Sequence, residues 1–428
     1  MTARPNTARA RRLALVALIV ILAAALRGCA VVQLPVDFDE PVYFRAGQRL
    51  AAAVREGDLD AFVNADAAPE HPALVKLLYA AVFLGYPPAP EVPDYPADLS
   101  PPRYAPYVTQ IGAMGTAARL SSALFGVLNV LLVGLVSPAA GGLLAIHTYT
   151  IKYTSQIYLE ALPMFTATVA VLAYCRAVGE QERKEEREQG RKGEDFFTPA
   201  PFLPFTRSPL FWWALSAVAL GLTAAGKYLY AVAGIAIAAD ALWRWGVERL
   251  GKREKGSRGD RETVRSPVHP FTPSPLLLLA WGGVALLVFF AANPNLWPDP
   301  VGRLAASLGF HAAYTQGPQV AQSGYPWYQP FVWLFTPQPV VWHPTVLFTP
   351  LDGLTAALGV LGAGPLWRSA GGRRRVVVLW WAIGLVFLLL WPTKWPQYSL
   401  IMTVPVCLCA AEGARQVASW ARRATGGE

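Results

Sequence analysis

Residues 13–36 read LALVALIVILAAALRGCAVVQLPV, and this stretch decides the class of the fold. Four arginines precede it within the first 12 residues, so a cleaved signal peptide has to be considered. Leu26–Cys29 also resembles a lipoprotein cleavage box, but Arg27 stands where that box needs a small uncharged residue. The apolar run continues beyond Cys29 to a length of about 24 residues, which is enough to cross a bilayer. We expect an uncleaved transmembrane helix, with Arg27 reaching the far interface.

The composition of the whole chain also indicates a membrane protein. Of its 428 residues, 54% are hydrophobic and only 15% are charged, and the mean hydropathy is +0.33. A soluble enzyme of this length carries more charge. The net charge of +9 would suit a nucleic-acid partner, but basic cytoplasmic loops account for it in a membrane protein. We therefore exclude nucleic acid. The four cysteines match no zinc, haem or disulfide spacing and are interpreted as packing residues.

Nine more apolar stretches follow the first. They run over about residues 117–136, 139–153, 157–178, 210–225, 228–245, 275–292, 351–367, 376–391 and 398–417. The chain is predicted to be an all-α polytopic membrane protein with about ten transmembrane helices (range 9–13) and a large helical first outer loop. Both termini then lie on one side. Because 26 of the 37 Lys and Arg residues fall on that side, it is predicted to be the cytoplasmic one.

This topology makes residues 1–428 a single integral membrane domain. Residues 35–107 form the first outer loop, with amphipathic surface helices, and residues 293–350 form the second. Residues 179–208 and 246–273 are charged, Pro-rich cytoplasmic linkers without the periodicity to bury a core. Most of the residues capable of chemistry lie in the two outer loops, so a chemical function is expected on that side.

The most informative motif comes directly after the first transmembrane stretch. Asp37-Phe38-Asp39-Glu40-Pro41 opens an apolar pattern with a spacing of four, so Pro41 is expected to start a helix. The carboxylates of Asp39 and Glu40 then either interact favourably with the positive end of the helix dipole or carry a function. Their position alone leaves both interpretations open.

Other ionisable residues lie at predicted helix ends. Glu160 stands at an outer helix mouth, where an unpaired charge is costly, so a function is favoured. Lys227 and Lys394 either bind an anionic group or anchor their helices. The segment 221–227 matches G-x-x-x-x-G-K, but position 228 is Tyr where a nucleotide-binding loop needs Ser or Thr, and no strand precedes it. The aromatic residues of the second outer loop suit either sugar rings or the membrane interface.

Together these features resemble the GT-C superfamily of membrane glycosyltransferases, particularly its protein-O-mannosyltransferase and aminoarabinose-transferase-like group (glycosyltransferase family 39 type). The resemblance rests on Arg27 at the end of the first helix, the Asp39-Glu40 pair, a His-Pro segment and a Lys…Tyr near the last helix. The family's His-Pro-Pro-Leu reads His71-Pro72-Ala73-Leu74 here, and no sizeable C-terminal soluble domain is expected.

The resemblance implies a role for each candidate residue. Asp39 and Glu40 would be catalytic, with Asp39 taking the proton of the acceptor hydroxyl, and Glu160 or His71 would order the acceptor or a metal ion. The donor phosphate would be held by cations among Lys394, Lys76, Lys227, Arg303 and Arg119, with Lys394 and Lys76 favoured. Tyr43, Tyr398 and Trp327 would contact the sugar or the lipid.

The implied activity is transfer of a hexose or pentose from a polyprenyl-phosphate donor to a hydroxyl group, by inverting displacement, in the cell envelope. The protein would be a multi-pass protein of the plasma membrane with an extracytoplasmic active site. The acceptor is open between lipid, glycan and protein. No cofactor is certain, because some relatives use a divalent metal and others do not. The alternative is a transporter or flippase of lipid-linked sugars, although the ionisable groups gather at one face rather than at the membrane midplane.

Overall fold

The computed structural model describes residues 5–65, 67–93, 111–188, 208–257, 274–340, 342–347, 349–368 and 374–425. In these segments the regular secondary structure is helical, apart from one isolated β-bridge between Val340 and His343. The first half of the chain forms α1 (Pro5–Gln33), α2 (Glu40–Glu56), α3 (Leu59–Asn64), α4 (Leu74–Phe83), α6 (Gly112–Val136), α7 (Pro138–Ile146), α8 (Thr148–Tyr153) and α9 (Ala161–Glu188). The second half forms α10 (Pro209–Gly226), η1 (Tyr228–Ala231), α11 (Val232–Ser257), α12 (Pro275–Ala291), η2 (Pro294–Leu296), α13 (Pro300–Tyr314), α14 (Pro318–Ser323), α15 (Gln329–Phe335), α16 (Asp352–Arg368), α17 (Arg375–Leu390), η4 (Pro396–Ser399) and α18 (Leu400–Ala424).

Five of the described helical segments are long and apolar enough to cross a membrane. They are Arg9–Gln33, Gly112–Val136, Ala161–Gly179, Pro209–Gly226 and Pro396–Ala424. The other predicted spans coincide with α11, α12, α16, α17 and the α7–α8 pair. Leucines that face outward are expected to meet lipid, as on α12, where Leu276 is 76% exposed and Leu287 is 72% exposed. The predicted class of all-α polytopic membrane protein is confirmed.

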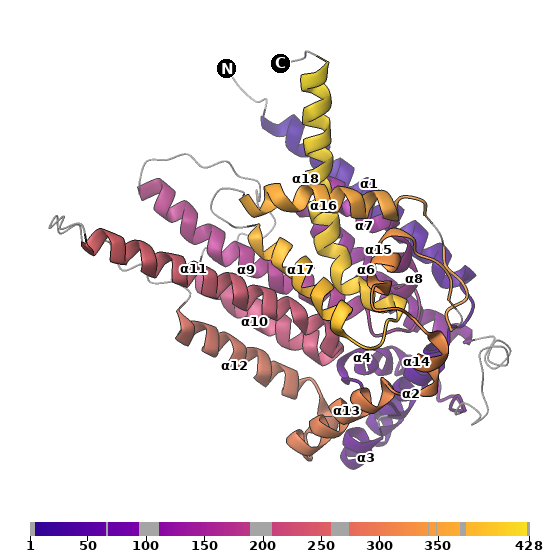
Figure 1. Cartoon of the computed structure of the whole chain (residues 1–428). Coiled ribbons are helices and arrows are strands. Elements are labelled where there is room, and N and C mark those ends of the chain that lie inside the picture. Colours follow the sequence, from indigo (N-terminus) through magenta and orange to yellow (C-terminus); the bar gives the residue numbers. More distant parts are fainter. Residues whose placement is uncertain are drawn as a thin grey trace.

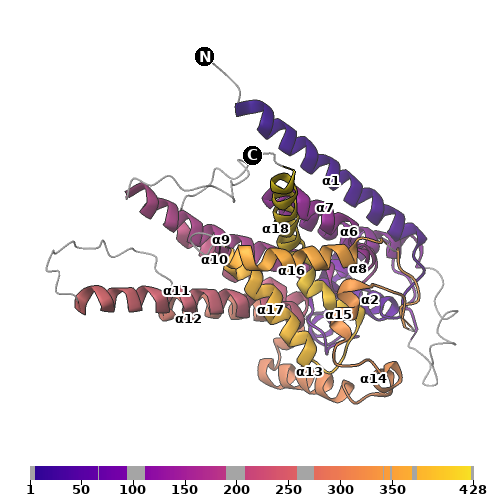
Figure 2. The ribbon, with the colours of Figure 1, turned by 45° about the horizontal axis from the view of Figure 1, so that its top comes forward.

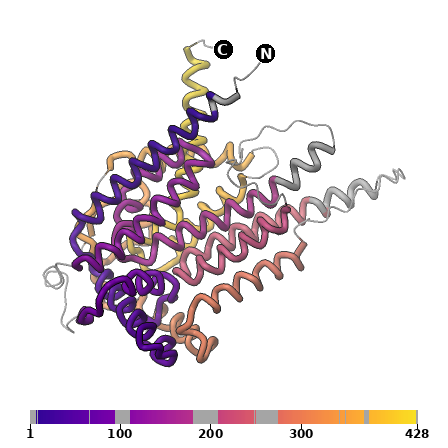
Figure 3. Tube along the Cα trace, turned by 180° about the vertical axis from the view of Figure 1, so that it is seen from behind, coloured from indigo at the N-terminus to yellow at the C-terminus, as the bar shows by residue number. Residues whose placement is uncertain are grey.

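The helices pack as two connected groups. One contains α9, α10, α11 and α12, which run side by side (Figure 1), and the other places α1 against α6 and α7, and α16 against α18. The view from behind shows the same arrangement (Figure 3). Helices α2–α4 and α13–α14, which belong to the two segments predicted as outer loops, gather at one end of the molecule (Figures 1 and 2). These two segments are called the outer segments below. The start of α1 and the end of α18 lie at the opposite end.

The stretch predicted as one short span over residues 139–153 is two helices instead. Ser137 caps α7, with its Oγ 3.4 Å from the backbone N–H of Ala140. His147 then ends α7 and caps α8, since its Nδ1 accepts from the backbone N–H of Thr150 at 3.4 Å. After α8 the backbone runs through a buried non-helical segment, residues 154–160, before α9 begins. This break brings Glu160 to the end of the molecule where the outer segments lie.

The first outer segment folds on itself as a helical pair. The expected helices exist as α2 and α4, and α2 packs against α4. The approach is close at Gly47, where a Cβ atom would lie 2.7 Å from Cε2 of Phe83, so a larger residue would push the helices apart. The predicted cytoplasmic linkers lie largely outside the described residues, and the position of these helices on the membrane surface stays a prediction.

Candidate functional site

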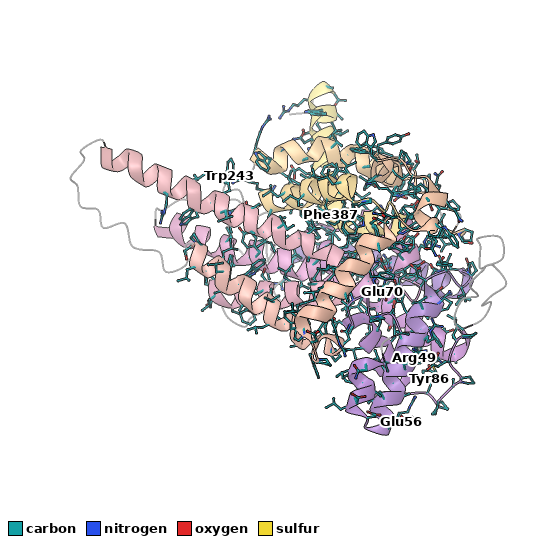
Figure 4. All side chains as sticks on the ribbon, turned by 60° about the horizontal axis from the view of Figure 1, so that its bottom comes forward. Arg49, Glu56, Glu70, Tyr86, Trp243 and Phe387 are labelled. Carbon is teal, nitrogen blue, oxygen red and sulfur yellow. The ribbon has the colours of Figure 1, made fainter. Side chains whose placement is uncertain are left out.

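A cavity of about 150 Å³ lies where the two outer segments meet the helix ends. Its polar lining consists of Asp39, Glu70, His71, Lys227, Gln319, His311, His343 and Gln397. Its aromatic lining consists of Phe38, Tyr43, Phe310, Tyr314, Trp342, Trp395 and Tyr398. Glu70 lies where the first outer segment meets α13 (Figure 4), because Ser307 and His311 of α13 bond its carbonyl oxygen at 2.5 and 3.0 Å. The cavity therefore combines residues that are distant in the sequence.

Asp39 occupies the position before α2 and lines the cavity. Its side chain is half-buried, and its Oδ2 is 3.5 Å from Nε2 of Gln397. Burial raises the pKa of Asp39, although His343 and Lys227 oppose this rise through their charges. A carboxylate with a raised pKa that faces a cavity is suited to accept a proton.

Glu40, the next residue, is fully buried and does not line the cavity. Its carboxylate forms an ion pair of 2.5 Å with Arg119 of α6 and accepts from the backbone N–H of Ile157 at 2.9 Å. Arg119 in turn donates to the carbonyl oxygens of Val31 and Leu34. This pair joins α1, α2 and α6 and accounts for Glu40 as a structural residue, while the catalytic role that the sequence suggested stays a prediction.

A second buried pair fixes the residue at the start of the same motif. Asp37 binds Nζ of Lys152 at 2.5 Å through Oδ2, and Nδ1 of His343 at 2.7 Å through Oδ1. The hydroxyl of Tyr158 is 2.9 Å from the same nitrogen of His343. Burial alone would raise the pKa of Asp37, but Lys152 and His343 outweigh this effect and hold the pKa well below its usual range. Sequence reasoning assigned no role to Asp37, Lys152 or His343, although a lysine in an apolar stretch signals a buried partner.

Glu160 and Lys227 meet at the wall of the cavity. Glu160 is fully buried, and Lys227, which lines the cavity, forms an ion pair with it. Burial raises the pKa of Glu160, while Lys227 opposes the rise. The ammonium group of Lys227 also lies 5.2 Å from the ring centre of Tyr398, at a cation–π distance. Glu160 thus holds Lys227 in place at the cavity.

The other four cations proposed for phosphate binding do not line the cavity. Lys394 donates to the carbonyl oxygens of Leu388 and Leu389 at 2.6 and 2.9 Å, so its ammonium group closes the C-terminal end of α17. Lys76 donates to backbone carbonyls of its own loop, among them that of Ala68 at 2.6 Å.

Arg119 belongs to the pair with Glu40, and Arg303 bonds the carbonyl oxygens of Val63 and Asn295 at 2.9 Å each. Among the described cations, Lys227 is therefore the candidate that the fold brings to the cavity.

His71 lies beside His311, with ring centres 5.1 Å apart, and both rings line the cavity. Nε2 of His71 is 3.9 Å from the carboxylate of Glu70. Burial lowers the pKa of both histidines, so they are neutral near pH 7. Within the described residues no group of three or more His, Cys, Asp or Glu side chains is arranged to hold a metal ion.

Of the three aromatic residues predicted to contact the sugar or the lipid, two line the cavity and one does not. Tyr43 and Tyr398 line the cavity. Trp327 is 66% exposed and lies outside the lining.

Comparison with known proteins finds no matching family model and no matching curated protein. Among solved structures, the chain is similar to the oligosaccharyltransferase AglB of Archaeoglobus fulgidus in complex with an inhibitory peptide and a dolichol-phosphate, with a TM-score of 0.50 and 12% identity over 97% of this chain and 51% of that one. The apo form of the oligosaccharyltransferase from the same organism gives a TM-score of 0.45 and 13% identity, over 97% and 52% of the two chains. The chain spans about half the length of these proteins, and at this identity the likeness concerns the fold. The chain is thus a polytopic membrane protein whose fold is similar to that of the AglB complex.

Proposed function

We propose that the protein is a membrane glycosyltransferase that moves a sugar from a polyprenyl-phosphate donor to an acceptor hydroxyl group. The observation that carries this proposal is Asp39, a half-buried carboxylate with a raised pKa that lines the cavity together with Lys227. A base and a cation in one cavity are the two groups that such a transfer requires. The dolichol-phosphate in the AglB complex supports a lipid-linked phosphate as the donor class.

The reaction is a single inverting displacement. The acceptor oxygen attacks the anomeric carbon, the bond from that carbon to the phosphate oxygen breaks, and the acceptor proton passes to Asp39. The lipid phosphate leaves as a stable anion and needs no general acid. Lys227 would stabilise its charge, and Tyr43 and Tyr398 would contact the sugar or the first units of the lipid. We place the cavity on the extracytoplasmic side of the plasma membrane and both termini in the cytoplasm, as the distribution of Lys and Arg favours.

The test is release of polyprenyl phosphate by the full-length protein in lipid discs, with a panel of polyprenyl-phosphate hexoses and pentoses. Asp39→Asn is nearly isosteric but cannot accept the proton, so we expect the rate to fall by about 100-fold or more. Asp60→Asn is the matched control, since Asp60 is exposed on α3 and its Oδ1 accepts a hydrogen bond from Nδ2 of Asn64 at 2.9 Å. Full transfer by Asp39→Asn would remove the base assignment. Movement of lipid-linked sugar across vesicles, without release of phosphate from any donor, would replace the transferase with a flippase.

A further inference from the structure

The charges of the cavity are unfavourable for the donor that the proposed function requires. Its lining holds the carboxylates of Asp39 and Glu70. Among the described lining residues, Lys227 is the only lysine or arginine. The charge of Lys227 is already matched by Glu160. A phosphate group brought into this cavity therefore needs at least one further donor, because an anion among carboxylates is repelled.

Histidines are the remaining side chains of the described lining that can supply a positively charged donor. His71 and His311 are neutral near pH 7, since burial lowers the pKa of each. His343 differs from them because an ionised carboxylate, that of Asp37, lies at hydrogen-bonding distance from its ring. A carboxylate in this position fixes the ring through Nδ1 and leaves Nε2 as the nitrogen that can meet a ligand.

The surroundings of His343 fix the orientation of its ring. Asp37 accepts from Nδ1 and is itself held by Lys152 and by the backbone N–H of Phe38 at 2.8 Å. The bridge to Val340 holds the backbone of His343, with the two N–H···O bonds at 3.0 and 3.2 Å. The side chain is 4% exposed and lines the cavity. Within the described part of the chain no hydrogen bond is recorded for its other nitrogen, Nε2.

We propose that His343 is a second phosphate-binding group of the site. Nδ1–H donates to Asp37, and Nε2–H donates to an oxygen of the phosphate of a polyprenyl-phosphate ligand, before transfer and after the phosphate has become the leaving group. Asp37 and Lys152 are positioning residues that act through the ring. The proposal rests on the proposed function for its ligand, and it is tested by binding as well as by turnover.

Two substitutions test the contributions of the two ring nitrogens separately. His343→Asn keeps an N–H near the position of Nδ1 but removes the group at Nε2, whereas His343→Gln can place an N–H near Nε2. The control is His147→Asn, which removes a buried histidine outside the cavity and leaves a side chain suited to cap α8. The ligands are polyprenyl phosphate and the uncharged polyprenol, and their affinities are measured in lipid discs with full-length protein.

We expect His343→Asn to weaken binding of polyprenyl phosphate by about tenfold or more, as for loss of a hydrogen bond to a charged group. Binding of polyprenol is expected to stay unchanged, and His343→Gln is expected to recover part of the loss. If His343 were merely structural, both ligands would lose affinity together. Equal affinity of wild type and His343→Asn for polyprenyl phosphate would overturn the proposal.

The binding and turnover results also separate the two proposals. Selective phosphate binding through His343 without sugar transfer from any donor would leave this inference standing and remove the proposed function. Sugar transfer that depends on Asp39, together with equal affinities of wild type and His343→Asn for polyprenyl phosphate, would support the proposed function and remove this inference.

Discussion

The Glu40→Gln variant distinguishes a carboxylate that holds the fold from one that takes part in transfer. Glu40 accepts five hydrogen bonds: two from Arg119, one each from the backbone N–H groups of Asp37 and Ile157, and one from the amide of Gln156. A glutamine keeps the shape of the side chain, but it turns one acceptor oxygen into an N–H₂ group that faces donors. It also leaves the buried guanidinium of Arg119 without its counter-charge.

Removing one partner of a buried ion pair costs about 3–5 kcal/mol in free energy of unfolding. Unfolding entropy scales as about 2.1 cal/mol/K per residue, which for 428 residues amounts to about 0.9 kcal/mol/K. The expected decrease in Tm is therefore about 3–6 °C. Membrane helices keep their backbone hydrogen bonds when tertiary contacts are lost, so the unfolding entropy is smaller in a bilayer and the decrease is at least this large.

The assay compares thermal unfolding of wild type, Glu40→Gln and the control Glu56→Gln in one detergent. Glu56 is an exposed residue at the end of α2 (Figure 4). Sugar transfer is then measured well below Tm and expressed per folded protein. We expect a lower Tm with transfer retained to within a few-fold. An unchanged Tm would refute the structural assignment, and an unchanged Tm with lost transfer would return Glu40 to the catalytic residues.

Two further predictions concern Asp39 and Lys394. Burial raises the pKa of Asp39, so its carboxyl stays protonated to a higher pH than a free aspartic acid, which titrates near about 3.9. The kcat/KM of sugar transfer is therefore expected to fall as the pH is lowered, with the midpoint of this acidic limb above the value for free aspartic acid, and to level off at the higher pH where Asp39 is ionised. A midpoint at or below about pH 4 would contradict this. Lys394→Ala removes the donors that close α17 and is expected to lower stability by about 1–3 kcal/mol while the affinity for polyprenyl phosphate stays unchanged. A selective loss of that affinity with the same Tm would restore Lys394 as a phosphate ligand.

The sequence predicted the helices where apolar length decided the outcome. The span expected at residues 117–136 is the greater part of α6, and the one at residues 210–225 is nearly all of α10. The prediction from the sequence failed at residues 139–153, because hydropathy does not show that a helix-capping residue divides this apolar stretch. Ser137 and His147 each satisfy a backbone N–H and begin a new helix, which divides the stretch into α7 and α8.

For the site, the sequence predicted that Asp39 lies at the start of a helix, because a helix start is a local feature; its catalytic role stays a prediction. The sequence could not separate Asp39 from Glu40, since the partner of Glu40 is Arg119 on α6. Lys227 and Lys394 also look alike in the sequence, as lysines near helix ends with a tyrosine close by. The fold turns the first toward the cavity and uses the second to close α17.

The sequence by itself determined the membrane class, the positions of long apolar helices such as α6 and α10, and the acidic start of α2, because apolar length and helix starts depend on neighbouring residues. Only the tertiary structure decided which charges meet. Asp37 and His343 are 306 positions apart, and their contact exists because both outer segments pack at the same end of the helices. A buried charge needs a partner, but which partner it finds depends on the packing of the helices, and no local pattern records that.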